Sequence, residues 1–246
     1  MSAQGIIIKA SADRESSWIG LCKLCGAASL ILLGYSLATM AILVLIGGQP
    51  ASAQEGFALL QENRLTGLLR LDLLTVLVMP LYYVLFLGLY LALKKTHERY
   101  ALLATVLGVA GVTMFLSTPS VFSWAALSDK FAAAGTDAQR AQLLAAGEAI
   151  LASDMWHGTG AVMSGLLVQT ATLLMSVMML RNGAFSKMTA WVGIGMHGLD
   201  LLHVLVGFFA PAMGVMLMWV AGPLYLVWFP LLARDFFRLG QTSPSQ

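Results

Sequence analysis

The chain has 246 residues, of which 59% are hydrophobic and only 11% are charged, and its formal net charge is +2. Soluble globular domains carry about 25% charged residues, so this composition excludes an ordinary soluble domain. The net charge is small and no basic run is present, so nothing in the composition points to nucleic-acid binding. The mean hydropathy of +0.81 instead predicts that the lipid bilayer is the main partner of the chain.

Six apolar stretches follow one another, each close to or above the roughly 20 residues that cross a bilayer as a helix. They cover residues 26–47, 68–93, 101–127, 156–180, 188–209 and 212–233. Ala51-Ser52-Ala53 resembles a signal-peptide cleavage site, but the first stretch is longer than a typical signal segment, so we expect it to be retained. We therefore predict an all-α polytopic bundle of six transmembrane helices, forming one domain over residues 1–246.

The distribution of basic residues predicts the orientation of this bundle, because positive residues concentrate on the cytoplasmic side. They fall in the N-terminal segment, in the turns after the second and fourth stretches and in the tail, as Lys9, Arg14, Lys23, Lys94, Lys95, Arg99, Arg181, Lys187, Arg234 and Arg238. With six crossings these segments share one side. We expect a bacterial inner-membrane protein whose N-terminal segment 1–17 and tail 239–246 are both cytoplasmic.

The outer loop 128–155 contains a further predicted helix over residues 137–153. Thr136 precedes it in a position typical of a helix cap. Its apolar residues, spaced as on one side of an amphipathic helix, could lie along the membrane surface or cover the mouth of the bundle. They are Leu143, Leu144, Ala146, Ile150 and Leu151.

A few ionisable residues lie within or beside the apolar stretches, where a charge is costly and usually serves a purpose or pairs with another group. They are Arg70, Asp72, Asp154, His157, His197, Asp200 and His203. The predicted topology places Asp72, the pair Asp154 and His157, and the pair Asp200 and His203 toward the outer face on three different helices. His197 falls nearer the middle. Arg70 could reach Asp154 or Asp200 on a neighbouring helix.

Imidazole and carboxylate groups suit zinc, iron or copper. His197 and His203 lie roughly 9 Å apart along a helix axis, so one ion cannot easily bind both. A single ion would take Asp200 with one of these histidines and His157 from another helix. Asp72 or Asp154 would then serve as a further ligand, a base or a supporting group. For haem, the axial ligands would be His157 and His203.

Three other hypotheses remain open from the sequence. The same residues could form a purely structural polar network, or they could relay protons in a proton-coupled carrier. The chain could also be a non-catalytic subunit that packs against a partner or a second copy. Cys22 and Cys25 share a helix face and are expected to be buried or lipid-edge thiols, since no partners for a redox or metal role are visible nearby. Whether the protein is an enzyme stays open.

Several motifs resemble those of a known group of proteins. They are the run Met179-Leu180-Arg181-Asn182-Gly183-Ala184-Phe185-Ser186-Lys187, the following Gly193 and Gly195, the ending from Trp228 through Ala233-Arg234-Asp235-Phe236-Phe237-Arg238-Leu239-Gly240, and the earlier Ala145-Ala146-Gly147-Glu148-Ala149. From about residue 64 to 240 the chain resembles multi-pass bacterial membrane proteins known only as a domain of unknown function. The resemblance implies a multi-pass topology and an inner-membrane location, and it assigns no activity to any residue.

Overall fold

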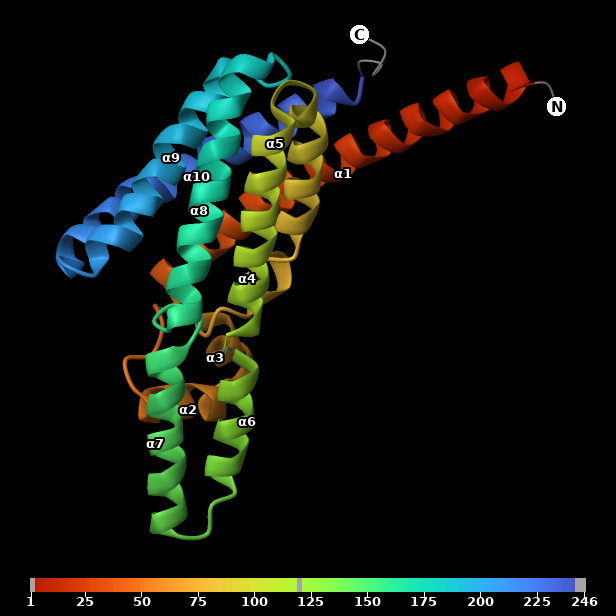
Figure 1. Ribbon diagram of the computed structural model, residues 1–246. Coiled ribbons are helices and arrows are strands. Elements are labelled where there is room, and N and C mark those ends of the chain that lie inside the picture. The colour runs from red at the N-terminus through yellow and green to blue at the C-terminus, as the bar shows by residue number, and fades with distance from the viewer. Residues whose placement is uncertain (1–2, 119–120, 242–246) are drawn as a thin grey trace. The chain divides into compact units, whose positions relative to one another are not determined.

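The computed structural model describes residues 3–118 and 121–241. The predicted all-α fold is confirmed, because every regular element in these residues is a helix (Figure 1). The ten helices described are α1 (Ala3–Leu45), α2 (Ala53–Glu62), α3 (Arg64–Arg70), α4 (Leu73–Val78), α5 (Leu81–Ser117), α6 (Val121–Ala132), α7 (Asp137–Ser153), α8 (Thr159–Asn182), α9 (Lys187–Gly207) and α10 (Pro211–Leu239). Residues 1–2 of the predicted N-terminal segment and 242–246 of the predicted tail lie outside this description.

Within the described chain, five helical segments are long and apolar enough to cross a membrane, which supports a membrane protein. They are Glu15–Leu45, Leu73–Ala132, Thr159–Asn182, Lys187–Gly207 and Pro211–Leu239. The predicted number of six is not reached, because the second segment runs for 60 residues. That segment joins the second and third predicted stretches, and it includes residues 119–120, which are not described.

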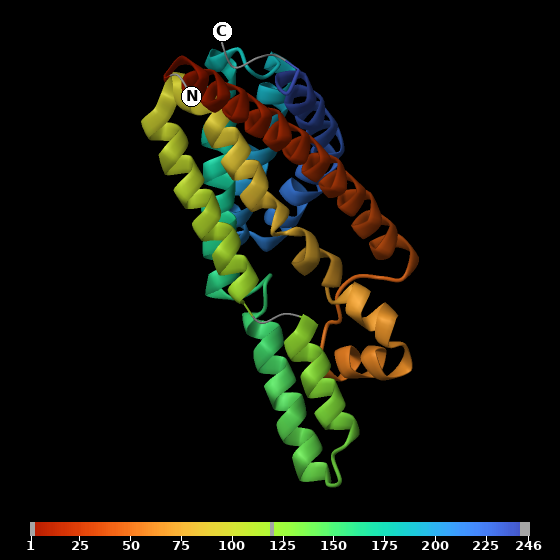
Figure 2. The ribbon, with the colours of Figure 1, turned by 90° about the vertical axis from the view of Figure 1, so that its right-hand side faces the viewer.

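The helix α5 is not continuous, although it carries one label. His97 has non-helical backbone angles (φ −140°, ψ 49°), so two helical halves meet there. The yellow ribbon of α5 turns back on itself at this point in both views (Figures 1 and 2). Gly108 in the second half lies directly against the ring of Phe86 in the first, where a side chain on Gly108 would clash. The two halves therefore lie side by side as a hairpin.

The chain forms two compact units, which are described separately below. The first unit comprises Met1–Leu33, Leu81–Gly108 and Gln169–Gln246, and the second comprises Gly34–Pro80 and Val109–Val168. The first unit thus contains α9, α10 and the part of α8 that follows Val168. A single domain over the whole chain stays a prediction.

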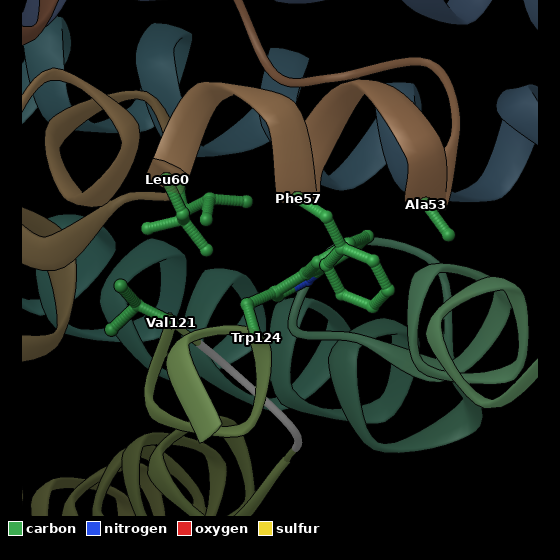
Figure 3. Packing of buried hydrophobic residues seen from close by; sticks show 6 residues of the cluster. Ala53, Phe57, Leu60, Val121 and Trp124 are labelled. Carbon is green, nitrogen blue, oxygen red and sulfur yellow. The ribbon is translucent and has the colours of Figure 1, made fainter. Parts of the chain in front are cut away.

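Aromatic packing between α2 and α6 forms the core of the second unit (Figure 3). The Phe57 and Trp124 rings are buried and meet edge to face, with centroids 5.8 Å apart. Gly56 makes this approach possible, because a Cβ atom there would come within 2.6 Å of the Trp124 ring. Gly147 likewise allows α7 to approach α2 closely, since a Cβ atom on Gly147 would lie 2.7 Å from the Cβ of Ala53.

The helix α7 begins where the sequence predicts, and Thr136 is confirmed as its cap. The Thr136 hydroxyl accepts a hydrogen bond from the Gln139 N–H at 3.2 Å. Its apolar residues Leu144, Ile150 and Leu151 pack against the core of α2 and α6. These three side chains therefore serve packing within the second unit, and a membrane-surface role is not needed to explain them.

In the first unit, a buried acid near the end of α10 holds the start of α9. Asp235 is fully buried, and its Oδ2 accepts hydrogen bonds from the Ser186 N–H at 2.8 Å and the Thr189 hydroxyl at 2.5 Å. The Phe185 and Phe236 rings meet edge to face beside it, with centroids 5.5 Å apart. The segments 179–187 and 228–240, on which the resemblance described above rests, thus pack against each other.

We predict that the Asp235→Ala variant lowers the free energy of unfolding by about 1.5–3 kcal/mol, because the Ser186 N–H and Thr189 hydroxyl lose a charged acceptor in a buried position. Tryptophan fluorescence during unfolding in mixed detergent micelles measures this loss. Glu98→Ala, which removes an exposed carboxyl, is the control and should change the free energy by less than about 0.5 kcal/mol. Equal effects of the two substitutions would contradict this role for Asp235.

Candidate functional site

The six residues predicted to form a metal site divide between the two units. Asp72, Asp154 and His157 belong to the second unit, whereas His197, Asp200 and His203 belong to the first. In the part of the chain that the structure describes, no group of three or more His, Cys, Asp and Glu side chains is arranged to hold a metal ion. Each unit nevertheless gathers its own polar residues into a network.

The network of the first unit joins α8, α9 and α10 inside their apolar segments. The Nδ1 of His197 lies 2.7 Å from the Oε1 of Gln169. The Nε2 of Gln169 donates to the Asp200 Oδ2 at 3.3 Å and to the Tyr225 hydroxyl at 3.4 Å. The Tyr225 hydroxyl donates a short hydrogen bond to the same Asp200 oxygen. One amide side chain thus connects an imidazole, a phenol and a carboxyl group.

These contacts assign the tautomer of His197. Because the amide nitrogen of Gln169 faces Asp200 and Tyr225, its oxygen faces His197 and can only accept a hydrogen bond. The proton of the neutral ring therefore sits on Nδ1, and Nε2 is left as an acceptor. The ring is 1% exposed and packs edge to face on Trp228, with centroids 4.9 Å apart. Among the described residues, the His197 Nε2 and Trp228 Nε1 atoms are buried without a hydrogen-bond partner.

His203 forms its hydrogen bond with α10 rather than with Asp200. It lies three residues after Asp200, yet its Nδ1 donates to the backbone oxygen of Gly214 at 2.8 Å. This bond links α9 to α10 close to the turn between them. A histidine that binds a backbone carbonyl through Nδ1 presents Nε2 as its free basic atom.

Asp72 is the centre of the network in the second unit. It is the one non-glycine residue with positive φ (62°) in the described chain, and it stands where α3 ends and α4 begins. Its carboxyl group accepts hydrogen bonds from the Trp156 indole N–H at 2.8 Å, from the Gln49 amide and from the Thr75 hydroxyl at 3.4 Å. Aspartate is one of the few residue types that enter the left-handed region readily.

Asp154 and His157 form a hydrogen-bonded pair in the turn between α7 and α8, outside the helix on which the sequence placed them. The Asp154 Oδ1 accepts from the His157 Nδ1 at 2.9 Å and from the backbone N–H groups of Trp156 and His157. Trp156 donates to Asp154 through its backbone and to Asp72 through its indole ring. Trp156 therefore connects two carboxyl groups of the predicted metal site. The adjoining pocket, lined by Asp154 and Gln49 among others, has room for about one water molecule.

Arg70 pairs with a different acid from those expected. Its Nη2 donates to the Glu55 Oε1 at 3.0 Å and its Nε to the Gly48 oxygen at 2.7 Å, and neither Asp154 nor Asp200 is its partner. The Ala51 N–H also donates to the Glu55 Oε2 at 2.8 Å. This N–H and the Arg70 guanidinium lower the pKa of the Glu55 carboxyl. Gly48 before α2 and Glu55 in the first turn of α2 satisfy Arg70, so no neighbouring span is needed.

The expectation of buried thiols is confirmed for Cys22 and Cys25, which are free and buried in α1. The residues that sequence reasoning missed are Gln169, Tyr225 and Trp156, all neutral at ordinary pH. Comparisons of the chain with models of protein families, with curated proteins and with solved structures give no match. The functional argument therefore rests on the geometry of the two networks.

We predict a pH-dependent effect of the Glu55→Gln substitution. Because the folded pKa of Glu55 is lowered, its stabilisation is present above the unfolded pKa of about 4.3 and disappears as the pH falls through the folded value. The contribution should stay below about 1 kcal/mol, since the Glu55 side chain is 42% exposed and solvent screens the pair.

Unfolding free energies of the wild type and of the variant, measured from pH 3 to pH 7, test this effect. The difference should be constant at the upper end of the range and vanish at the lower end. The exposed Glu62→Gln substitution is the control. A difference that grows toward low pH would have the wrong sign and would contradict the assigned role of the Ala51 and Arg70 bonds.

Proposed function

We propose that this chain is an integral protein of the bacterial inner membrane that binds and passes a proton through Asp200, as part of a proton-coupled carrier. One observation carries the proposal. The carboxyl group of Asp200 is 9% exposed inside an apolar helix, and its hydrogen-bond partners in the described chain, Tyr225 and Gln169, are neutral. No described ion pair includes it.

The energetics of burial explain why this arrangement favours proton exchange. An unpaired carboxylate in an apolar surrounding is costly, whereas the neutral acid is much cheaper to bury. The Tyr225 hydroxyl can donate to the ionised carboxyl group of Asp200 or accept from the protonated one. Gln169 orients its neighbours through fixed donor and acceptor atoms. A proton on Asp200 therefore has partners that can respond to its arrival and departure.

The proposal includes six helical segments within the membrane and both chain termini on the cytoplasmic side. A helix of 60 residues would be about 90 Å long, three times the roughly 30 Å of the hydrocarbon layer, so Leu73–Ala132 must turn. The break at His97 and the contact of Gly108 with Phe86 support one crossing on each side of that turn. Lys94, Lys95 and Arg99 surround the break, which supports a cytoplasmic turn and two cytoplasmic termini.

We predict that the Asp200→Asn variant loses proton-coupled flux at least tenfold, because asparagine keeps the shape of the side chain but cannot carry the proton. Proteoliposomes loaded with the pH indicator pyranine are given an acid exterior, and a panel of amino acids, sugars and organic cations is added in turn. The control is Asp129→Asn, which removes only an exposed carboxyl that pairs with Arg64. No solute-dependent proton flux with the wild type, or undiminished flux with Asp200→Asn, would contradict the proposal.

A metal ion or haem is the second candidate, favoured by one observation. In each of His157, His197 and His203 the Nδ1 atom is engaged with an acceptor, as is usual for histidines that bind metal through Nε2. Detergent-purified protein with bound zinc, iron or copper in elemental analysis, or with a Soret absorption band, would support it. A blank in both measurements removes this candidate and leaves the proton proposal unaffected.

A further inference from the structure

We infer that the hairpin of α9 and α10 ends inside the outer leaflet of the bilayer, where Phe208 and Phe209 contact lipid acyl chains. The turn between the two helices would then not emerge into water. This inference uses the cytoplasmic orientation proposed above, but it does not depend on a proton-transfer role for Asp200.

The side chains of the turn are unsuited to water. Between His203 and Tyr225 the indole N–H of Trp219 is the only polar side-chain group. At the turn itself, Phe208 is 61% exposed and Phe209 is 91% exposed. The turn between α6 and α7 in the same chain is flanked instead by charged residues, namely Asp129, Lys130, Asp137 and Arg140. A turn exposed to water would be expected to carry such charged residues.

The backbone of the turn is also suited to a low-dielectric surrounding, where every unpaired N–H group is costly. The N–H groups of Phe209 and Ala210 both donate to the Val206 oxygen, at 3.0 and 2.8 Å. The next residue, Pro211, has no N–H group, and the Gly214 N–H donates to the Ala210 oxygen at 3.0 Å. The connection thus satisfies these donors within itself.

The two helices meet closely at this end, which leaves no long loop that could reach the aqueous phase. A Cβ atom on Gly214 would come within 2.8 Å of the Gly207 Cα. Close backbone contact through small residues is typical of helices that pair in lipid. The hydrogen bond from His203 to the Gly214 oxygen holds the same two segments together.

The length of α9 places the turn below the outer boundary of the hydrocarbon layer. Trp191 is 62% exposed and lies one turn after Lys187, as expected of a residue at the inner interface. Gly207 follows 16 residues later, a rise of about 24 Å. This rise is less than the roughly 30 Å of the hydrocarbon layer, and any tilt of the helix would shorten it further.

Lipid, rather than a protein partner, is the occupant that the surface favours. The exposed apolar surface does not end at the turn. It continues along both helices through Leu202, Leu205, Met213, Met216 and Val220. Side chains of spanning segments that are exposed in this way face the acyl chains of the bilayer. Phe208 and Phe209 extend that surface without a polar boundary.

Site-directed fluorescence quenching tests the inference. Phe209→Cys is made in a Cys22→Ser, Cys25→Ser background, labelled with the environment-sensitive dye NBD and reconstituted in phosphatidylcholine vesicles. Phe208→Cys is the second turn variant, in case the first does not fold. Val220→Cys on α10 is the control for a lipid-facing position, and Ala134→Cys in the α6–α7 turn is the control for an aqueous one.

Doxyl-labelled lipid should quench the dye at the turn as strongly as at Val220, and aqueous iodide should quench it at least fivefold less than at Ala134. Iodide quenching equal to that at Ala134 would overturn the inference, because the turn would then lie in water. Protection from both quenchers would also overturn it, because protein rather than lipid would then cover the turn. Neither result bears on the loss of flux expected for Asp200→Asn, so the two proposals fail separately.

Discussion

The burial of the Asp200 carboxyl group among apolar helices is the constraint on which the account of the first unit depends. Water cannot solvate this group, so the protein must supply its hydrogen-bond partners. Tyr225 from α10 and Gln169 from α8 do so, and Gln169 in turn engages His197. The need to satisfy one acid therefore joins three helices at a single depth. It also explains why an amide and a phenol occur in otherwise apolar segments.

The same two helices, α9 and α10, are tied together on either side of this network. On one side, the buried Asp235 accepts hydrogen bonds from Ser186 and Thr189 at the start of α9. On the other, His203 binds the Gly214 oxygen beside the turn. Such links restrict sliding of one helix along the other, and they therefore fix the register between Asp200 on α9 and Tyr225 on α10. These links therefore keep the buried Asp200 carboxyl group in contact with Tyr225 and Gln169.

Much of this could be predicted from the sequence, and the failures have physical causes. The Thr136 cap and the start of α7 follow from the local sequence and are confirmed. The partner predicted for Arg70 was wrong, because Gly48 before α2 and Glu55 in the first turn of α2 offer nearer acceptors than another span. Gln169 and Tyr225 were missed because the predicted site was built from ionisable side chains alone. A signal existed, since each is the only residue of its type in its apolar stretch, 156–180 and 212–233.

The central claim is that Asp200 exchanges a proton within the membrane. Infrared difference spectroscopy of the reconstituted protein, between acidic and alkaline pH, observes this exchange directly through the carbonyl band of a protonated carboxyl group. We expect a carbonyl band that the Asp200→Asn substitution removes and the Asp129→Asn substitution leaves in place. Difference spectra that are the same with and without the Asp200 carboxyl group would contradict it.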